Sequence, residues 1–319
     1  MTHKPDALQI HQPIAAAMAA PASLSTGRLE FECRRVPEAG VASSKRKSCR
    51  AFSQAIVLPI QAKMTRAMNE SLQAARNAMD SAEHITVLTG AGISTDSGIP
   101  DFRGPKGLWT TNPAAEKMSD IRYYVRDREV RKAAWQARLE HAAWTAKPNA
   151  GHTALVELER RGKLHAVVTQ NIDGLHQRAG NSPARVIEVH GTVHQVVCLD
   201  CGWKGPMLET LDRVRTGELD PPCRKCNGML KSDTISFGQS LVPEVLNRAF
   251  DAAQRCDLLL SIGTTLQVYP VAGLVPAAKD SGARIIIVNA QPTPFDSIAD
   301  AVLRSPISEV LPKICRAGG

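Results

Sequence analysis

The chain has 319 residues, of which 43% are hydrophobic and only 4% aromatic. This apolar content is ordinary for a globular protein, so we expect a core built mainly from aliphatic side chains. No stretch reaches the roughly 18 apolar residues that a membrane-spanning helix needs, and we expect no membrane association.

The net charge of +8 is concentrated near the N-terminus. Residues 1–63 contain nine Lys or Arg and four Asp or Glu, so they carry 9 − 4 = +5 and leave +3 for the rest. A basic tail is weaker evidence for nucleic-acid binding than a basic folded surface, so we do not expect nucleic acid as a partner. Because residues 1–63 lack sustained periodicity, we interpret them as a disordered leader or a mis-assigned extension.

From residue 64 onward, apolar strand patterns alternate with helical patterns. Strands are expected at 85–89, 165–169, 186–189, from about 234, at 257–262 and at 284–289, and helices at 67–82, 127–144, 151–161, 243–254 and 271–281. This alternation predicts the α/β class, with a doubly wound, parallel, Rossmann-like sheet. Within a catalytic domain at 64–319, we expect a helical insert at about 105–150 and a small cysteine-containing module at about 194–232.

Several polar or glycine-containing segments follow these strands directly. They are residues 90–92, 170–173, 190, 263–265 and 289. In doubly wound sheets, ligands bind outside the carboxyl ends of the strands. The sequence therefore predicts a binding site that collects these segments at one edge of the sheet.

The glycine segment Gly90-Ala91-Gly92 departs from the usual dinucleotide fingerprint. Thr95 occupies the position of the third glycine, and no acidic residue stands about 20 positions further on, where Trp109 and two threonines occur. The pattern disfavours a hydride-transferring dehydrogenase and favours a nucleotide site of another kind.

Two CxxC pairs, Cys198/Cys201 and Cys223/Cys226, have the spacing of a zinc site. Four thiolates leave no open position for water, so the metal is expected to be structural. Acidic and basic residues are mixed around the pairs, which disfavours a nucleic-acid-binding ribbon. Free thiolates belong to a reducing compartment, and we expect a cytoplasmic location.

His190 stands at a strand end, immediately before Gly191. A histidine in that position is either a structural residue or a general base. Because the other strand-end segments converge on the same edge, we favour the general base.

Together these residues resemble the sirtuin (Sir2) family of NAD-dependent protein deacylases. The shared motifs are GAGIS at 90–94, GIPDFRG at 98–104, TQNIDGLH at 169–176, HG at 190–191, the two CxxC pairs, and GTTLQVYP at 263–270. They occur in the family's order across residues 64–312, and the leader has no part in the match.

The resemblance implies an NAD site, an acyl-lysine site and one structural Zn²⁺ on Cys198, Cys201, Cys223 and Cys226. The residues implied in NAD binding are Gly90, Ala91, Gly92, Ser94, Asp101, Phe102, Arg103, Trp109, Gln170, Asn171, Ile172, Asp173, Gly263, Thr264, Thr265, Asn289 and Ile307. The peptide is expected to add as a strand between Phe237-Gly238 and the segment of Val268.

The resemblance also implies the chemistry, with His190, Asn171 and Asp173 as catalytic residues. The acyl oxygen of the modified lysine attacks C1′ of the nicotinamide ribose of NAD, and nicotinamide leaves. His190 then acts as base on a ribose hydroxyl, which attacks the imidate carbon, and water completes the transfer. The implied activity is a protein-lysine deacylation of the deacetylase type, its products are free lysine and O-acyl-ADP-ribose, and the partners are acyl-lysine proteins. The alternative is transfer of ADP-ribose to protein, which is assigned to some family members.

The chain departs from the family at three places. Gln239 replaces the usual Glu, Thr265 replaces a frequent Ser, and Trp135-x-x-Arg138 stands where succinyl-preferring members carry Tyr-x-x-Arg. Arg138 either pairs with an acidic acyl group or is a solvated charge beside a core Trp135. The preferred acyl group therefore stays open at this point.

Overall fold

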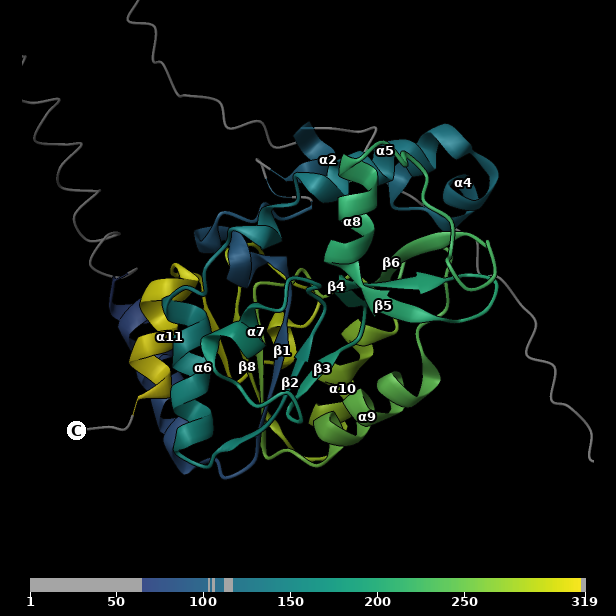
Figure 1. Ribbon diagram of the computed structural model, residues 1–319. Coiled ribbons are helices and arrows are strands. Elements are labelled where there is room, and N and C mark those ends of the chain that lie inside the picture. Colours follow the sequence, from purple (N-terminus) through teal and green to yellow (C-terminus); the bar gives the residue numbers. More distant parts are fainter. Residues whose placement is uncertain (1–64, 103, 105–106, 112–116, 317–319) are drawn as a thin grey trace, which may run out of the picture. The chain divides into compact units, whose positions relative to one another are not determined.

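The computed structural model describes residues 65–102, 104, 107–111 and 117–316 (Figure 1). The chain divides into two units at Ala55 and Ile56, and every described residue lies in the second, Ile56–Gly319. The predictions for residues 1–63 and for Arg103 lie outside the described residues, and of Trp109 only the backbone is described.

A six-stranded sheet forms the centre of the second unit, in the order β3-β2-β1-β7-β8-β9, and all its pairs are parallel. The strands are β1 (Ile85–Thr89), β2 (Leu164–Thr169), β3 (Val186–Glu188), β7 (Leu258–Ile262), β8 (Arg284–Val288) and β9 (Ala301–Leu303). Counted along the chain, this order is 3-2-1-4-5-6, which is the arrangement of dinucleotide-binding folds, and its strand order reverses between β1 and β7. The prediction of a doubly wound parallel sheet is confirmed.

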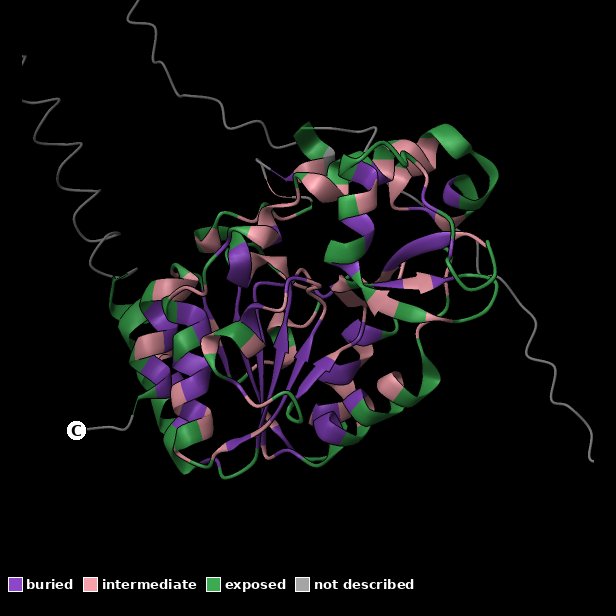
Figure 2. Cartoon of the chain, viewed as in Figure 1, coloured by how far each residue is buried: buried purple, intermediate pink, exposed green. Residues whose placement is uncertain are grey.

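Helices cover both faces of this sheet, so its strands are buried on both sides (Figure 2). One layer contains a helix over residues 65–81, α6 (Ala150–Arg160) and α11 (Ile307–Cys315), and the other contains α9 (Pro243–Gln254) and α10 (Leu274–Asp280). Ile85 and Val87 pack into the first layer, whereas Leu88 packs into the second. Because its side chains enter apolar layers on both faces of the sheet, the strand is buried throughout, including its two threonines.

A second, antiparallel sheet has the order β5-β4-β6. It consists of β4 (Gly191–Cys198), β5 (Lys204–Pro206) and β6 (Leu230–Thr234), and α8 (Met207–Arg215) packs on it. The prediction that a strand starts near Thr234 is wrong, because β6 ends there. The following Phe237 instead exchanges backbone hydrogen bonds with Ser119 and Ile121.

The segment before α6 is helical, as predicted, but it is broken into short pieces. These are α2 (Leu108–Thr111), α4 (Ile121–Arg126), α5 (Arg128–Leu139) and η2 (Ala142–Trp144). The Asp127 side chain accepts a hydrogen bond from Glu129 N (2.8 Å) and begins α5. Trp135 of α5 lies in one apolar cluster with residues of β4 and α8.

The remaining elements are short. They are η1 (Ala91–Ser97), α7 (Leu175–Ala179), η3 (Val271–Gly273) and η4 (Asp296–Ile298). Across the described ranges, every helix is too short or too polar to cross a membrane.

We predict that Gly263→Ala destabilises the protein more than Gly282→Ala. Both glycines have positive φ (60° and 92°), where an L-residue costs about 1–2 kcal/mol. A Cβ on Gly263 would also lie 2.6 Å from Ile93 N, whereas nothing lies within 4 Å of one on Gly282. The free energy of unfolding, measured in urea, should fall clearly further for Gly263→Ala. Equal losses would contradict the close contact between these loops.

Candidate functional site

The loops after β1 and β7 touch through their backbones, at the point where the strand order reverses. Gly92 N donates to Gly263 O (2.9 Å). A Cβ on Gly92 would lie 2.7 Å from Gly263 Cα, and one on Gly90 would lie 2.7 Å from Thr264 Cβ. Glycine is required here because two backbones approach more closely than side chains permit.

The loop after β2 joins these two loops. Gln170 Nε2 donates to Thr264 Oγ1 (3.0 Å), while Asn171 Nδ2 donates to Gly90 O (3.1 Å) and to Ser94 Oγ (3.2 Å). Three segments separated by more than seventy residues are therefore held together by amide side chains. The prediction that strand ends collect at one edge is confirmed for these residues.

Asp173 lies at the end of this hydrogen-bonded group and is only 4% exposed. Its Oδ2 accepts a hydrogen bond from Ser94 Oγ (2.7 Å), and its Oδ1 accepts one from Leu175 N (2.9 Å). Hydrogen bonds to an ionised carboxylate are stronger than neutral ones. The aspartate thus fixes the start of η1 against the loop after β2.

His190 connects the large sheet to the small one. Its Nδ1 lies 3.0 Å from Gln170 O, and because a carbonyl oxygen only accepts, Nδ1 carries the proton and Nε2 is the basic atom. Burial lowers the pKa of His190 from its ordinary value, and the bond to Gln170 O partly opposes this shift. Gly191 follows with φ 73° and starts β4, while His190 O accepts from Ile235 N (2.8 Å).

The other predicted NAD residues are more dispersed. Asp101 Oδ1 accepts from Gly104 N (2.8 Å), Phe102 is 45% exposed, and Asn289 is buried directly after β8, where its Nδ2 donates to Gln291 O (2.8 Å). No hydrogen bond within the described ranges joins the side chains of Asp101 or Asn289 to the group around Asp173.

Three further residues predicted to bind NAD lie in a loop, after a strand or at the start of a helix. Ile172 O accepts from Val193 N (2.9 Å), and Thr265 is half-buried after β7. Ile307 is the first residue of α11, and the next residue, Ser308, donates to Asp96 Oδ2 (2.6 Å) at the end of η1. The start of α11 is therefore attached to the glycine loop.

The predicted peptide edge is partly exposed. Phe237 is 45% exposed, Gly238 has φ 82°, and Val268 is half-buried. Phe237 N donates to Ser119 O (2.8 Å), and Ile121 N donates to Phe237 O (3.0 Å). This backbone pairing with residues 119–121 has no signal in the local sequence.

Two buried histidines that sequence reasoning left without a role lie beneath the site. The rings of His152 and His176 are 5.1 Å apart between centroids. His152 Nδ1 accepts from Asn149 N (3.3 Å), and His176 Nε2 lies 3.0 Å from Thr89 Oγ1. Burial lowers their pKa values to about 4 and about 3. The sequence signal that could have indicated a role for His152 is Asn149, because asparagine is a frequent N-cap and here caps α6 in a capping box with His152.

The four predicted cysteines form one cluster, with all Sγ atoms within 4.8 Å of one another. Cys198 and Cys226 are 3.5 Å apart between Sγ atoms, and Cys201 and Cys223 are 3.9 Å apart. A tetrahedron with metal–sulfur bonds of about 2.3 Å has sulfur–sulfur edges of about 3.8 Å. The donor set and its dimensions therefore fit a metal site of the zinc type.

Trp135 and Arg138 differ in their surroundings. Trp135 is 1% exposed and lies in one apolar cluster with Cys198 and Cys223, so its interpretation as a core residue is confirmed. Arg138 is half-buried, and burial lowers the pKa of its guanidinium, so it is only partly a solvated charge. Arg138 lines a cavity of about 20 Å³ together with Trp135 and Lys231.

These features define a class: a dinucleotide-binding sheet with a strand-end histidine and an inserted four-cysteine module. The sequence profile of the Sir2 family matches residues 90–270. The chain is also 50% identical over 235 residues to NAD-dependent protein deacetylase 2 of Streptomyces coelicolor, a match that covers 74% of this chain and 98% of the relative. The chain belongs to the Sir2, or sirtuin, family.

Solved structures agree with this assignment. A Sir2 enzyme structure superposes with a TM-score of 0.71 at 41% identity, covering 78% of this chain and 97% of that one. A complex of Sir2 with a p53 peptide and NAD⁺ gives a TM-score of 0.67 at 34% identity, covering 75% and 94%.

We predict that the protein loses stability as the pH falls from about 6.5 to about 4. The unfolded chain binds protons on His152 and His176 below about pH 6.5, whereas the folded chain keeps both neutral down to about pH 4 and about pH 3. Each histidine then adds a slope of about 1.4 kcal/mol per pH unit.

Urea unfolding of wild-type protein and His176→Gln across this pH range measures the effect. The variant should show a smaller slope, and His84→Gln, at an exposed position, should keep the wild-type slope. Equal slopes for wild-type protein and His176→Gln would contradict the burial of a neutral imidazole at His176.

Proposed function

We propose that this chain is an NAD-dependent protein-lysine deacylase that releases nicotinamide and forms O-acyl-ADP-ribose. The observation that carries the proposal is the position of His190 at the same sheet edge as the interlocked loops of Gly90, Asn171 and Gly263. The Streptomyces coelicolor relative is named as a protein deacetylase, and the related Sir2 complex contains a peptide and NAD⁺.

The loops after the strands provide glycine backbone for the phosphates of NAD and polar side chains for its nicotinamide ribose. Glycines at the reversal of strand order leave space for phosphate next to the backbone. We assign Gly90, Gly92 and Gly263 to this role, and Asn171 and Asp173 to the nicotinamide ribose. NAD itself supplies a cleavable glycosidic bond and a ribose hydroxyl that accepts the acyl group.

His190 is suited to take a proton from that hydroxyl. Its Nδ1 proton is held by Gln170 O, so Nε2 is free to accept a proton. Because burial lowers its pKa, the imidazole is neutral at pH 7. Activity should therefore rise with pH through a value below the ordinary 6.5 and stay constant above it.

We predict that His190→Asn abolishes deacylation without unfolding the protein. Loss of a general base lowers kcat by about 10²–10⁴-fold. The turnover of an acyl-lysine peptide, the melting temperature and the zinc content should be measured together. His84→Asn, at an exposed histidine, is the control and should be within about two-fold of wild type in kcat. Full turnover by His190→Asn would refute the assignment.

The alternative reaction transfers ADP-ribose to protein. NAD labelled in its ADP-ribose part distinguishes the two. Label that leaves as acylated ADP-ribose supports deacylation, whereas label that stays on protein supports transfer.

We further infer that the preferred acyl groups end in a carboxylate. Arg138 and Lys231 both lie at the cavity beside Ser236, the residue before the peptide edge. Lys231 Nζ donates to the carbonyls of Ser232 and Thr234, and burial together with the Arg138 charge lowers its pKa to about 8.

None of the residues that line this cavity is acidic, although Asp233 is near enough to oppose the lowering of the Lys231 pKa. In the described part of the chain, no acidic side chain lies within ion-pair distance of Arg138, and the buried Trp135 Nε1 has no hydrogen-bond acceptor. A carboxylate would satisfy the guanidinium and the indole together.

We predict that succinyl-lysine is a better substrate than acetyl-lysine, and that Arg138→Gln reverses this order. Loss of a charge-assisted contact of 1.5–3 kcal/mol corresponds to a drop of about 10- to 100-fold in kcat/KM for the succinyl peptide. The acetyl value should change little. A panel of acetyl, succinyl and long-acyl peptides, read by mass spectrometry, measures this. Arg126→Gln, at an exposed arginine of α4, is the control, and equal losses on all peptides would contradict the inference.

Two finer assignments accompany this function. We propose zinc as the metal of the four-cysteine cluster, which metal analysis of purified protein would identify. Free thiolates and NAD fit a cytoplasmic location, which imaging of a tagged protein would test.

A further inference from the structure

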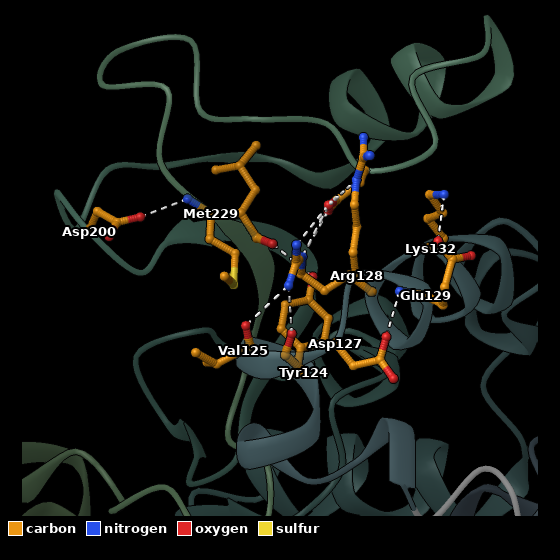
Figure 3. Close-up of polar contacts among 11 residues, drawn as sticks. Tyr124, Val125, Asp127, Arg128, Glu129, Lys132, Asp200 and Met229 are labelled. Atoms are coloured by element: carbon orange, nitrogen blue, oxygen red, sulfur yellow. Dashed lines mark hydrogen bonds and ion pairs between the residues drawn. The ribbon is translucent and has the colours of Figure 1, made fainter.

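Arg131 of α5 connects three separate segments. Its Nε lies 3.1 Å from Asp220 Oδ2, and its Nη1 donates to the carbonyls of Tyr124 and Val125 (3.2 Å each). The side chains of Arg131 and Asp220 are both only 14% exposed. Figure 3 shows these contacts around Tyr124, Val125 and Arg128. Arg131 therefore holds α4 and α5 to the loop that carries Asp220.

That loop belongs to the four-cysteine module. Asp220 precedes Cys223 by three residues, and Trp135, one turn after Arg131 on α5, lies in the same apolar cluster as Cys198 and Cys223. Tyr124 Oη also donates to Leu230 O at the start of β6 (2.7 Å). The module and the helices α4 and α5 thus share a partly buried ion pair, a hydrogen bond and an apolar cluster.

The N-terminal end of α4 holds the peptide edge. The Asp120 side chain accepts from Arg122 N (2.8 Å) and caps α4, and Asp120 forms a parallel bridge with Phe237. Backbone hydrogen bonds from Phe237 to Ser119 and from Ile121 to Phe237 complete this pairing. A displacement of α4 would therefore move Phe237, whereas none of these contacts involves the loops after β1 and β7.

We propose that Arg131 is a positioning residue that couples metal occupancy of the four-cysteine cluster to affinity for the acyl-lysine peptide. With the metal bound, the loop of Asp220 is ordered and Arg131 holds α4, and with it Phe237, in the peptide-binding position. Linkage makes the effect reciprocal, so bound peptide slows loss of the metal. This coupling rests on the proposed function, which identifies the ligand as an acyl-lysine peptide. The coupling leaves the loops assigned to NAD unchanged.

The test uses the full chain loaded with zinc, in the variant Arg131→Gln. Arg128→Gln is a matched control, because Arg128 reaches the same carboxylate at 3.5 Å but is 69% exposed, and exposed pairs contribute little. Steady-state kinetics give KM for peptide, KM for NAD and kcat. A chromogenic chelator gives the rate of zinc release with and without the acyl peptide, a readout that needs no turnover.

For Arg131→Gln, we expect KM for the peptide to rise about ten-fold, within the usual range of coupling between sites. KM for NAD and kcat should stay within about two-fold, because the sheet loops are not touched. Zinc release should be faster, and protection by the peptide should be reduced. Arg128→Gln should match wild type in every measurement.

Two results would overturn the proposal: Arg131→Gln behaving like Arg128→Gln, or KM for NAD rising as much as KM for peptide. If Arg131→Gln does not fold, Asp220→Asn replaces it, because that change removes the charge but keeps the side-chain volume. Failure of the proposed function is recognised separately, as absence of NAD cleavage by wild-type protein with every acyl peptide.

Discussion

The contact between the loops of Gly92 and Gly263 is the constraint on which the rest of the site depends. Gly263 takes φ 60°, and its Cα is so close to Gly92 that neither position admits a side chain. This contact joins β1 to β7 where the strand order reverses. Gln170 and Asn171 can bridge the two loops only because this approach has already been made.

Much of the fold follows from the alternation of apolar runs in the sequence. β7 and β8 are predicted well because both of their faces are buried. β9 and α11 were not predicted, since a strand of three residues carries too little periodicity and the helix contains Pro312. The end of β6 was misplaced because Lys231 and Asp233 interrupt its apolar pattern, and its partner β4 determines its length.

The candidate site was predictable where a residue follows a strand and not where it depends on tertiary pairing. Asn171, Asp173 and His190 follow strands, so the geometry of parallel sheets places them on one edge. Local sequence contains no trace of the pairing of Arg131 with Asp220, which are 89 positions apart. The same holds for the tilted contact of the His152 and His176 rings, because each histidine resembles an ordinary helical residue.

The attachment of the small sheet through His190 has a mechanical consequence. The module leaves the large sheet at Gly191 and returns at Thr234, and these two residues pair directly, so both crossings form a single two-stranded stem. The imidazole stands at the base of this stem, and Phe237 lies three residues beyond it. The hydrogen bonds of His190 Nδ1 to Gln170 O and of Val193 N to Ile172 O fasten the base of this stem to the loop after β2, so a swing of the small module would bend the chain beyond the imidazole and leave the imidazole with the large sheet.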